Sequence, residues 1–410
     1  CRGLPKDRGF LVAAGLEDCL KFLEDFAFDD SDLDYLGSIG FAKGDLHRFS
    51  SLRFTGEVWA VPEGTILFAN EPLLEVTAPI AEAQLVETYL LNQCTFQTAL
   101  ASKAARCRLA AGDRLDLVEF GMRRTHGIES AMAVARLSAM CGFVGTSNVQ
   151  AARRFGLRPS GTMAHSYIEA FDDEMEAFLT FGADFPDQAT FLVDTYGTMA
   201  GVADAIAAIR ALGLEGRAGV RLDSGDVVAL ARQTREVLDA AGLSKVRIFV
   251  SGGLDEHDLA RFVAERAPID AVGIGTRLGV SEDAPYLDTA YKLVEYAGRA
   301  VMKLAEGKAT LPGPKQVFRS PGMRDTIACR DEVPPPQAVP LLEQVMVGGQ
   351  RSFGTPTLGM LRERLERQLR DLPEEARPLV SAVVPAATTS DTLRRLDEAV
   401  RAATRAMSPR

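Results

Sequence analysis

The chain has 410 residues, and its 46 Lys and Arg against 56 Asp and Glu give a formal net charge of −10. A sequence-independent nucleic-acid binder needs a concentrated basic surface for phosphates, so this composition excludes that class as the leading interpretation. A content of 47% hydrophobic and 25% charged residues is ordinary for a globular protein. The length suffices for two domains, or for one large barrel with additions.

The apolar stretches of the sequence are short. Ile269–Gly275 and Phe191–Val193 are far shorter than the roughly 20 residues that a membrane-spanning helix requires, so no spanning segment is expected. The opening residues lack the apolar core of a secretion signal, and nothing indicates export. Because the first residue is Cys1 and not Met, we also expect that the true start is missing.

Six cysteines and four histidines are scattered along the chain without metal-ligand spacing. No CxxC pair occurs, so we expect no metal site built from these side chains. Reduced thiols fit a cytoplasmic protein best.

Alternating apolar and polar residues mark the first predicted sheet. Residues 53–77 carry short alternating runs separated by Gly, Pro and Asn, which is typical of antiparallel strands with one covered face. Residues 11–28 and 81–109 have apolar residues at helical spacing. We therefore predict an α/β sandwich domain with a linking helix over residues 1–112.

The pattern changes at about residue 115, where short apolar runs alternate with helical segments. Four of these runs begin near residues 191, 219, 246 and 269, a spacing of about 25 residues, which fits one βα unit. Seven runs end in small or polar residues: LDLVEFG, GFVGTSN, SGTMAHS, FLVDTYGT, GVRLDSGD, VRIFVSGG and IDAVGIGT. Seven units predict a barrel of parallel strands over residues 113–297.

The rest of the chain is predicted to return to the first domain. Residues 298–330 alternate in character and are expected to complete the sandwich domain. Residues 331–410 are expected to be a linker around Pro334–Pro336 followed by a helical extension, with amphipathic helices over 358–372 and 392–407.

Groups capable of chemistry follow each predicted strand. In a βα barrel the carboxyl ends of the strands face one common mouth, where active sites lie. The groups at these ends are Arg123, Arg124, Thr146, Ser147, Asn148, Thr162, His165, Asp194, Arg221, Asp223, Gly252, Gly253, Gly275 and Thr276. Any one of them could be an ordinary loop or cap residue, but their shared topological position favours a site.

Two glycine-rich strand ends, residues 251–253 and 273–276, predict a phosphate site. Glycine lets backbone N–H groups approach a phosphate closely, although tight turns also need glycine. Arg221 and Asp223 share one face of a strand, since side chains at i and i+2 point the same way. Such a pair can bind an anion and hold ribose hydroxyls or a magnesium-bound diphosphate, and a structural ion pair is the alternative.

His165 lies at a predicted strand end among small residues. Its imidazole could act as acid, base or nucleophile, and a structural histidine is the alternative. His47 and His257 are predicted to be surface residues.

Several segments, read together, closely resemble nicotinate phosphoribosyltransferase in order and in spacing. The likeness covers residues 8 to 320. The segments are EFGMRRTHG (119–127), GFVGTSN (142–148), SGTMAHSYIEAF (160–171), LVDTYGT (192–198), GVRLDSGD (219–226), SGGLDE (251–256) and MKLAEGKATLPGPKQVFR (302–319).

The resemblance implies an irregular, incomplete TIM-like α/β barrel plus an α/β sandwich, in a type II phosphoribosyltransferase that is usually dimeric. Such enzymes join nicotinate to 5-phosphoribosyl 1-diphosphate, giving nicotinate mononucleotide and diphosphate in NAD biosynthesis. Mg²⁺ accompanies the diphosphate, and ATP hydrolysis is coupled through a phosphohistidine. We therefore expect small-molecule substrates, a homodimer, and neither nucleic acid nor membrane as a partner.

The resemblance also assigns roles to residues. His165 matches the histidine phosphorylated from ATP and, with Arg221 and Asp223, forms the expected catalytic set. The expected nicotinate contacts are Phe120, Ser147, Gly161, Thr162 and Arg221. The expected phosphoribosyl and diphosphate contacts are Arg123, Asp223, Gly252, Gly253, Gly275 and Thr276. Ser147 stands where nicotinamide-using relatives place an aspartate, and its hydroxyl can donate to a carboxylate that an aspartate would repel.

Two departures from the family pattern leave alternatives open. The family usually begins with a further segment containing a ring-stacking tyrosine, and it usually has Ala-Gln-Gly where Thr125-His126-Gly127 stands. Without that segment, the chain could be a catalytically impaired homologue that binds a nucleotide or a partner. A nicotinamide-using phosphoribosyltransferase is disfavoured by Ser147, and a quinolinate phosphoribosyltransferase by the length of the chain.

Overall fold

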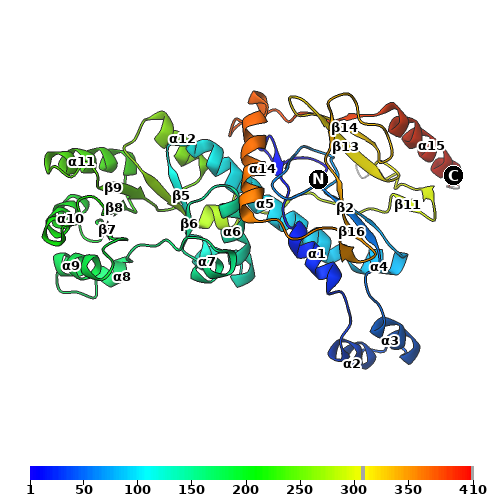
Figure 1. Cartoon of the computed structure of the whole chain (residues 1–410), viewed down its shortest axis with the longest axis horizontal. Coiled ribbons are helices and arrows are strands. Elements are labelled where there is room, and N and C mark those ends of the chain that lie inside the picture. The colour runs from blue at the N-terminus through cyan, green and yellow to red at the C-terminus, as the bar shows by residue number, and fades with distance from the viewer. Residues whose placement is uncertain (306–309, 408–410) are drawn as a thin grey trace. The chain divides into compact units, whose positions relative to one another are not determined.

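The computed structural model describes residues 1–305 and 310–407. The chain forms two compact units, one of residues Cys1–Ser102 and Ala284–Arg410 and the other of residues Lys103–Asp283 (Figure 1). None of the helices in the described ranges combines the length and the apolar character that a bilayer-spanning helix needs.

The second unit is built on a curled parallel sheet. Its six strands have the order β6-β5-β10-β9-β8-β7, and each pair of neighbouring strands is parallel. The strands are β5 (Asp116–Glu119), β6 (Gly145–Thr146), β7 (Thr190–Leu192), β8 (Gly219–Leu222), β9 (Arg247–Val250) and β10 (Ala271–Ile274). Because β6 and β7 stand at opposite ends of this order, the sheet is an incomplete barrel, which confirms the predicted fold class.

Helices follow the strands along the chain. They are α6 (Ile128–Met140), α7 (Val149–Phe155), α8 (His165–Ile168), α9 (Glu174–Asp184), α10 (Thr198–Leu212), α11 (Val227–Ala240), α12 (Glu256–Ala264) and α13 (Thr276–Gly279). Phe191, Val220, Ile248 and Val272 are fully buried. Near-continuous apolar runs of this kind belong to parallel strands that are covered on both faces.

The prediction of seven parallel strands is wrong for SGTMAHS. Residues 160–164 form no strand, although they are fully described, and His165 begins α8 instead. Met163 is the one large apolar residue of this segment, so it lacks the apolar run that a buried strand needs. The segment still lies along β6, because the backbone N–H of Ser160 donates to the carbonyl of Thr146 at 2.8 Å.

Two four-stranded sheets and a strand pair organise the first unit. One sheet has the order β17-β16-β2-β4, the other β15-β13-β14-β18, and β1 pairs with β3. The strands are β1 (Leu11–Val12), β2 (Glu57–Ala60), β3 (Ile66–Leu67), β4 (Leu74–Thr77), β11 (Glu295–Tyr296), β12 (Arg299–Ala300), β13 (Lys315–Ser320), β14 (Arg324–Cys329), β15 (Val339–Pro340), β16 (Glu343–Val347), β17 (Gln350–Arg351) and β18 (Thr388–Thr389). The antiparallel pairing of β2 with β4 confirms the prediction for residues 53–77.

The helices of the same sequence regions include the predicted ones, with small differences, and two that were not predicted, α2 and α3. They are α1 (Leu16–Glu24), α2 (Asp30–Ser38), α3 (Lys43–Ser50), α4 (Ile80–Leu85), α5 (Glu87–Ala111), α14 (Leu358–Asp371) and α15 (Asp391–Met407). The apolar stretch 81–109 is thus divided at Val86 between α4 and α5, and the stretch 11–28 gives β1 and a shorter helix.

The last third of the chain belongs to the same compact unit as residues 1–102, and its strand pairing differs in detail from the expectation. Residues 315–329 form the hairpin β13–β14 in a sheet with β15 and β18, and the strand that pairs with β2 is β16, from the region expected to be a linker. Residues 306–309 of the matching segment 302–319 lie outside the described residues. At two to six residues, β13–β18 are too short for alternation to separate strand from loop.

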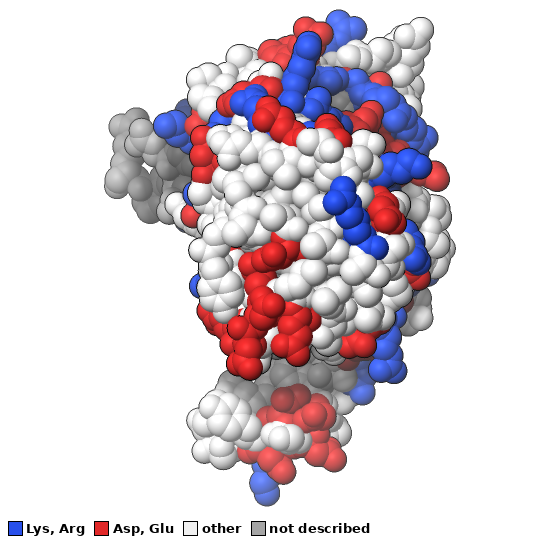
Figure 2. Space-filling view, turned by 90° about the vertical axis from the view of Figure 1, so that its left-hand side faces the viewer, with Lys and Arg blue, Asp and Glu red and all other residues white. Residues whose placement is uncertain are grey.

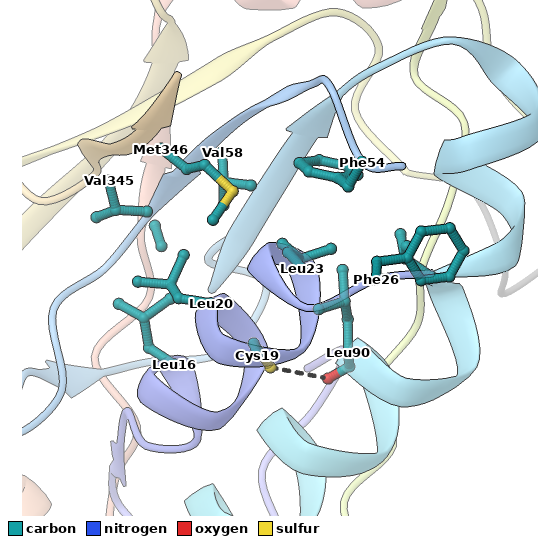
Figure 3. Packing of buried hydrophobic residues seen from close by; sticks show 12 residues of the cluster. Leu16, Cys19, Leu20, Leu23, Phe26, Phe54, Val58, Leu90, Val345 and Met346 are labelled. Atoms are coloured by element: carbon teal, nitrogen blue, oxygen red, sulfur yellow. Dashed lines mark hydrogen bonds between the residues drawn. The ribbon is translucent and has the colours of Figure 1, made fainter. Parts of the chain in front are cut away.

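One face of α1 forms the core of a hydrophobic cluster. Leu16, Cys19, Leu20 and Leu23 recur at helical spacing and pack with Val58, Leu90, Val345 and Met346 from β2, α5 and β16 (Figure 3). The Cys19 thiol also lies 3.9 Å from the carbonyl oxygen of Leu90. This cluster joins α1 to the sheet that contains β2 and β16.

Charge is unevenly distributed over the surface. Figure 2 shows acidic side chains gathered in the lower part of one face, with a broad uncharged area between them and many of the basic side chains. This face therefore presents no continuous basic surface.

We predict that Leu23→Ala destabilises the protein by about 2–5 kcal/mol, because Leu23 is 1% exposed and its loss leaves a cavity in the α1 cluster. Urea unfolding followed by circular dichroism measures the change. Lys21→Ala, on the exposed side of the same helix, is the matched control and is expected to change stability by less than about 0.5 kcal/mol. Equal losses in the two variants would contradict this assignment of the core.

Candidate active site at the carboxyl ends of the parallel strands

Arg221, on β8, connects three segments of the second unit. Its Nε donates to the Ser251 hydroxyl at 2.7 Å, and its other nitrogens donate to Thr162 Oγ1 at 2.6 Å and to Asp223 Oδ1 at 2.7 Å. The side chain is 14% exposed. The guanidinium plane is therefore fixed by residues that follow β8, by one that follows β9, and by the segment before α8.

Asp223 is held as a carboxylate. Burial alone would raise its pKa, but the hydrogen bond from the Ser251 hydroxyl and the charge of Arg221 bring the pKa below its usual value. The side chain remains 26% exposed. Asp223 thus offers a negative charge to a ligand at neutral pH.

His165 lies between two carboxylates and a hydroxyl. Its Nδ1 is 3.1 Å from Thr195 Oγ1, and its Nε2 is 3.8 Å from Asp223 Oδ2 and 4.0 Å from Asp194 Oδ1. The side chain is 42% exposed. An accessible imidazole with a carboxylate on one side and a hydroxyl on the other has a defined orientation for chemistry.

Asp194 lies behind this arrangement and is 2% exposed. Its Oδ2 accepts from the backbone N–H of Asp223 at 3.1 Å and from the Ser224 hydroxyl at 2.5 Å. Its Oδ1 is buried and accepts no hydrogen bond among the described residues, and it faces His165. Asp194 therefore ties the end of β7 to the end of β8.

An aromatic ring completes the wall beside Arg221. The guanidinium carbon of Arg221 is 5.7 Å from the centre of the Phe120 ring, and that ring is 5.5 Å from the ring of Phe249. A cation and an aromatic face at this separation suit a flat, anionic aromatic ligand.

Gly252 stands where the chain ends of β8 and β9 approach closely. Its φ is +104°, and a Cβ there would lie 2.2 Å from the carbonyl oxygen of Asp223. The adjacent Gly253 also has a positive φ, but a Cβ there would meet open space. The first glycine is therefore required by the backbone, and the second leaves room for a ligand.

The structure thus brings together Thr162, His165, Arg221 and Asp223, with Phe120 in ring contact. The other predicted residues occupy neighbouring positions without joining these side-chain hydrogen bonds. Arg123 is exposed in a 3-10 turn (Met122–Arg124), Gly161 is exposed, Ser147 is partly buried, and Gly275 and Thr276 lie at the start of α13. Whether they contact a ligand stays a prediction.

Sequence reasoning assigned no role to Asp194, Thr195 or Ser251. Ser251 directly follows β9, and Asp194 and Thr195 follow β7 by two and three positions, so their position at the mouth was visible as a signal. Their roles as partners of His165 and Arg221 depend on side-chain geometry.

Glu119 was also missed. It is 1% exposed, and burial raises its pKa, although the Thr146 hydroxyl and the backbone N–H of Gly121 both donate to its carboxyl group. The backbone N–H of Ser147 donates to its carbonyl at 2.8 Å. Glu119 therefore fixes the ends of β5 and β6 beside Phe120.

The three remaining histidines are exposed to solvent. His47 and His257 are exposed, as predicted, and His126 is exposed too. Within residues 1–305 and 310–407, no group of three or more His, Cys, Asp and Glu side chains could hold a metal ion.

An open parallel half-barrel with an anion-binding arginine, a paired aspartate and an accessible histidine at its strand ends defines an α/β-barrel protein that binds anionic small molecules. Residues 1–94 match the model of the nicotinate phosphoribosyltransferase N-terminal domain, and residues 115–306 match the nicotinate phosphoribosyltransferase family model. The chain belongs to the nicotinate phosphoribosyltransferase family, as its motifs predicted.

Individual relatives agree with this assignment. The nicotinate phosphoribosyltransferase pncB2 of Mycobacterium tuberculosis is 48% identical over 386 residues, covering 92% of this chain and 82% of that protein. The human nicotinate phosphoribosyltransferase is 31% identical over 468 residues, covering 93% and 87%. The crystal structure of human nicotinic acid phosphoribosyltransferase matches with a TM-score of 0.85 at 29% identity, covering 98% of this chain and 94% of that one.

Glu174 gives a pH-dependent prediction. It begins α9, and burial together with the charges of Asp204, Asp173 and Asp194 raises its pKa to about 7. Between the ordinary pKa of a glutamate and pH 7, the unfolded chain loses a proton that the folded chain keeps, so stability falls as the pH rises through this range.

We therefore predict that Glu174→Gln is more stable than the wild type at pH 8, and that this advantage disappears towards pH 4.5. Thermal unfolding at a series of pH values measures it. Glu176→Gln, an exposed neighbour on the same helix, is the control and should show no such trend. An advantage of Glu174→Gln that grows at low pH would contradict the assignment.

Proposed function

We propose that this protein joins nicotinate to 5-phosphoribosyl 1-diphosphate, releasing nicotinate mononucleotide and diphosphate. The observation that carries the proposal is the bonded arrangement of Arg221, Thr162 and Asp223 beside His165 and Phe120. The relatives at 48% and 31% identity are nicotinate phosphoribosyltransferases by name, which supports the same reaction.

Nicotinate would lie against the Phe120 ring with its carboxylate towards Arg221. The guanidinium attracts the carboxylate, and hydroxyl groups of Thr162 and Ser147 can donate to it. Gly161 is exposed beside Thr162 and leaves space for the ring. This set disfavours an uncharged carboxamide, because the positive charge of Arg221 would then have no anionic partner in the ligand.

The phosphoribosyl group would occupy the mouth next to Asp223. Backbone N–H groups of the glycine-rich ends at 252–253 and 275–276, with Arg123, would bind its phosphates. Mg²⁺ would enter with the diphosphate as part of the substrate. The carboxylate of Asp223 is accessible and ionised, as such a ligand requires.

In the reaction, the pyridine nitrogen forms a bond to the anomeric carbon while the bond from that carbon to the diphosphate oxygen breaks. Positive charge builds on the sugar, and negative charge on the leaving group. The carboxylates of Asp223 and Asp194 stabilise the positive charge on the sugar. The negative charge departs with the Mg²⁺-bound diphosphate. Catalysis is then mostly positioning and electrostatics.

We further propose that ATP phosphorylates His165. The carboxylates near Nε2 favour a proton on that nitrogen, which leaves a lone pair on Nδ1 to attack the γ-phosphate as ADP departs. Phosphohistidine would change the affinity of the mouth for its substrates and would not attack the sugar. A homodimer and a cytoplasmic location belong to the same proposal.

The test of the reaction is product formation from nicotinate, 5-phosphoribosyl 1-diphosphate and Mg²⁺, with nicotinamide as a parallel substrate. We expect nicotinate mononucleotide, and at least about tenfold less product from nicotinamide, because of the charge of Arg221. Chromatography of the nucleotides measures both products. Preferred use of nicotinamide would contradict the acid specificity, and no product from either ring would contradict the reaction.

His165→Ala should abolish the stimulation by ATP while leaving slow ATP-independent synthesis, because positioning by Arg221 and Phe120 remains. His257→Ala, an exposed histidine of the same unit, is the control and should keep the full ATP effect. The rates of nicotinate mononucleotide synthesis with and without ATP measure the stimulation in each variant. An unchanged ATP effect in His165→Ala would rule out the phosphohistidine.

A further inference from the structure

The two glycine-rich strand ends are connected by an ion pair outside the site described so far. Asp255 follows the first glycine segment and caps α12, since its Oδ1 accepts from the backbone N–H of His257 at 2.9 Å and of Asp258 at 3.3 Å. Its other oxygen, Oδ2, accepts from Arg277 at 2.5 Å. Arg277 comes directly after Gly275 and Thr276, so the bond joins the two segments at their helix starts.

A second, buried bridge spans the same two segments. The Nζ of Lys103, on α5, lies 2.5 Å from Glu256 Oε2 and 3.0 Å from Asp283 Oδ1, and the Nε of Arg106 lies 3.0 Å from Glu256 Oε1. Glu256 is the next residue after Asp255, and Asp283 lies a few residues beyond α13. Lys103, Arg106 and Glu256 are each at most 3% exposed.

These charges are fully paired. Burial would lower the pKa of Lys103, but Glu256 and Asp283 raise it above its usual value, so the ammonium group is retained. Burial would likewise raise the pKa of Asp255, but Arg277 and the helix N–H groups lower it. A buried ion pair adds little stability over apolar packing, so its geometry is the more informative feature.

Glycine segments cannot fix their own separation. Gly252, Gly253 and Gly275 have no side chains with which to hold one another, and a Cβ at Gly253 would meet open space. Parallel pairing between β9 and β10 is found only as far as Val250 and Val272, so beyond that point the separation of the two segments depends on the residues that flank them. The two bridges lie on those flanks, and shifts of about 1 Å in a binding site can change a rate by about 100-fold.

We propose that Asp255 and Arg277, supported by Lys103 and Glu256, are positioning residues that hold the two glycine segments at the separation required by a sugar diphosphate. The inference rests on the proposed function, because it takes these segments as the phosphate-binding loops. Asp255 acts through Arg277 and the helix start, and it does not contact the ligand.

The direction in which Asp255→Asn changes diphosphate binding distinguishes a positioning role from an effect of charge alone. Asp255→Asn removes a negative charge near an anion site, so an effect of charge alone would strengthen the binding of diphosphate. Asparagine also caps helices as well as aspartate does, so α12 keeps its start. Positioning instead predicts weaker binding, by about tenfold or more.

Two readouts on the full chain test this. Calorimetry with Mg²⁺ and inorganic diphosphate gives a Kd that needs no turnover, and steady-state rates give KM separately for 5-phosphoribosyl 1-diphosphate and for nicotinate. We expect Asp255→Asn to raise the Kd and the first KM together, and to change the KM for nicotinate by less than twofold. An unchanged or tighter Kd would overturn the inference.

Further variants control for stability and for folding. Asp325→Asn removes another buried carboxylate, 1% exposed against 12% for Asp255 and paired with Arg319 on β13 in the other unit, and should lower stability without changing the Kd for diphosphate. Arg277→Gln, at a side chain 39% exposed, tests the bond from its other end if Asp255→Asn fails to fold. Arg277 also pairs with Glu282 at 3.2 Å, so the double variant should bind no more weakly than Arg277→Gln alone, which already removes the bond to Asp255.

The outcomes distinguish this inference from the proposed function. Normal diphosphate binding without turnover of nicotinate would overturn the proposed reaction alone, and the comparison of Kd values would still decide the role of Asp255. A wild-type chain that binds no diphosphate would overturn the inference itself. Additive losses in the double variant would overturn the assignment of the two residues to one bond.

Discussion

The hydrogen-bonded guanidinium of Arg221 is the constraint on which the candidate site depends. It joins the end of β8 to Ser251 after β9 and to Thr162 in the segment before His165. Asp223 accepts hydrogen bonds from both Arg221 and Ser251, so the guanidinium of Arg221 also orients the carboxylate of Asp223. The segment that carries His165 is not a strand of this open half-barrel, and the bond from Arg221 to Thr162 anchors it to β8, as the bond from Ser160 to Thr146 anchors it to β6.

The charges of the site form a balanced set. In a chain with a net charge of −10, an anionic substrate meets repulsion at long range, so attraction must come from local groups. Asp223 partly offsets the charge of Arg221, and Asp194 adds a buried carboxylate behind His165. Under the proposed function, the carboxylates suit the positive charge that develops on a sugar, and the backbone N–H groups at the glycine-rich ends would bind phosphate. The site is thereby suited to a transition state with separated charges.

Much of this arrangement could be predicted from the sequence, because parallel strands deliver their carboxyl ends to one edge. From that rule, the sequence alone predicts that His165, Arg221 and Asp223 lie at one mouth. It failed for the backbone of SGTMAHS, which has too little apolar surface for a buried strand, yet the segment reaches the same place through its bonds to Thr146.

Other features could not be predicted, for physical reasons. The strand β16 is short and begins with two polar residues, so its pairing with β2 is set by tertiary contacts and not by periodicity. The bond between Asp255 and Arg277 joins residues 22 positions apart, and its formation depends on the relative positions of two loops. No local pattern in the sequence encodes such a distance.

The two kinds of structure in this chain follow from different requirements. A core such as the α1 cluster tolerates small shifts, because apolar contacts are numerous and have no preferred direction. A phosphate-binding loop of glycines tolerates few such shifts, because its hydrogen-bond donors are backbone N–H groups with fixed directions. Apolar packing behind such a loop would hold it together without fixing its orientation. Ion pairs with short, directional bonds, as at Asp255 and Glu256, fix both distance and direction, which gives a physical reason for retaining buried charges there.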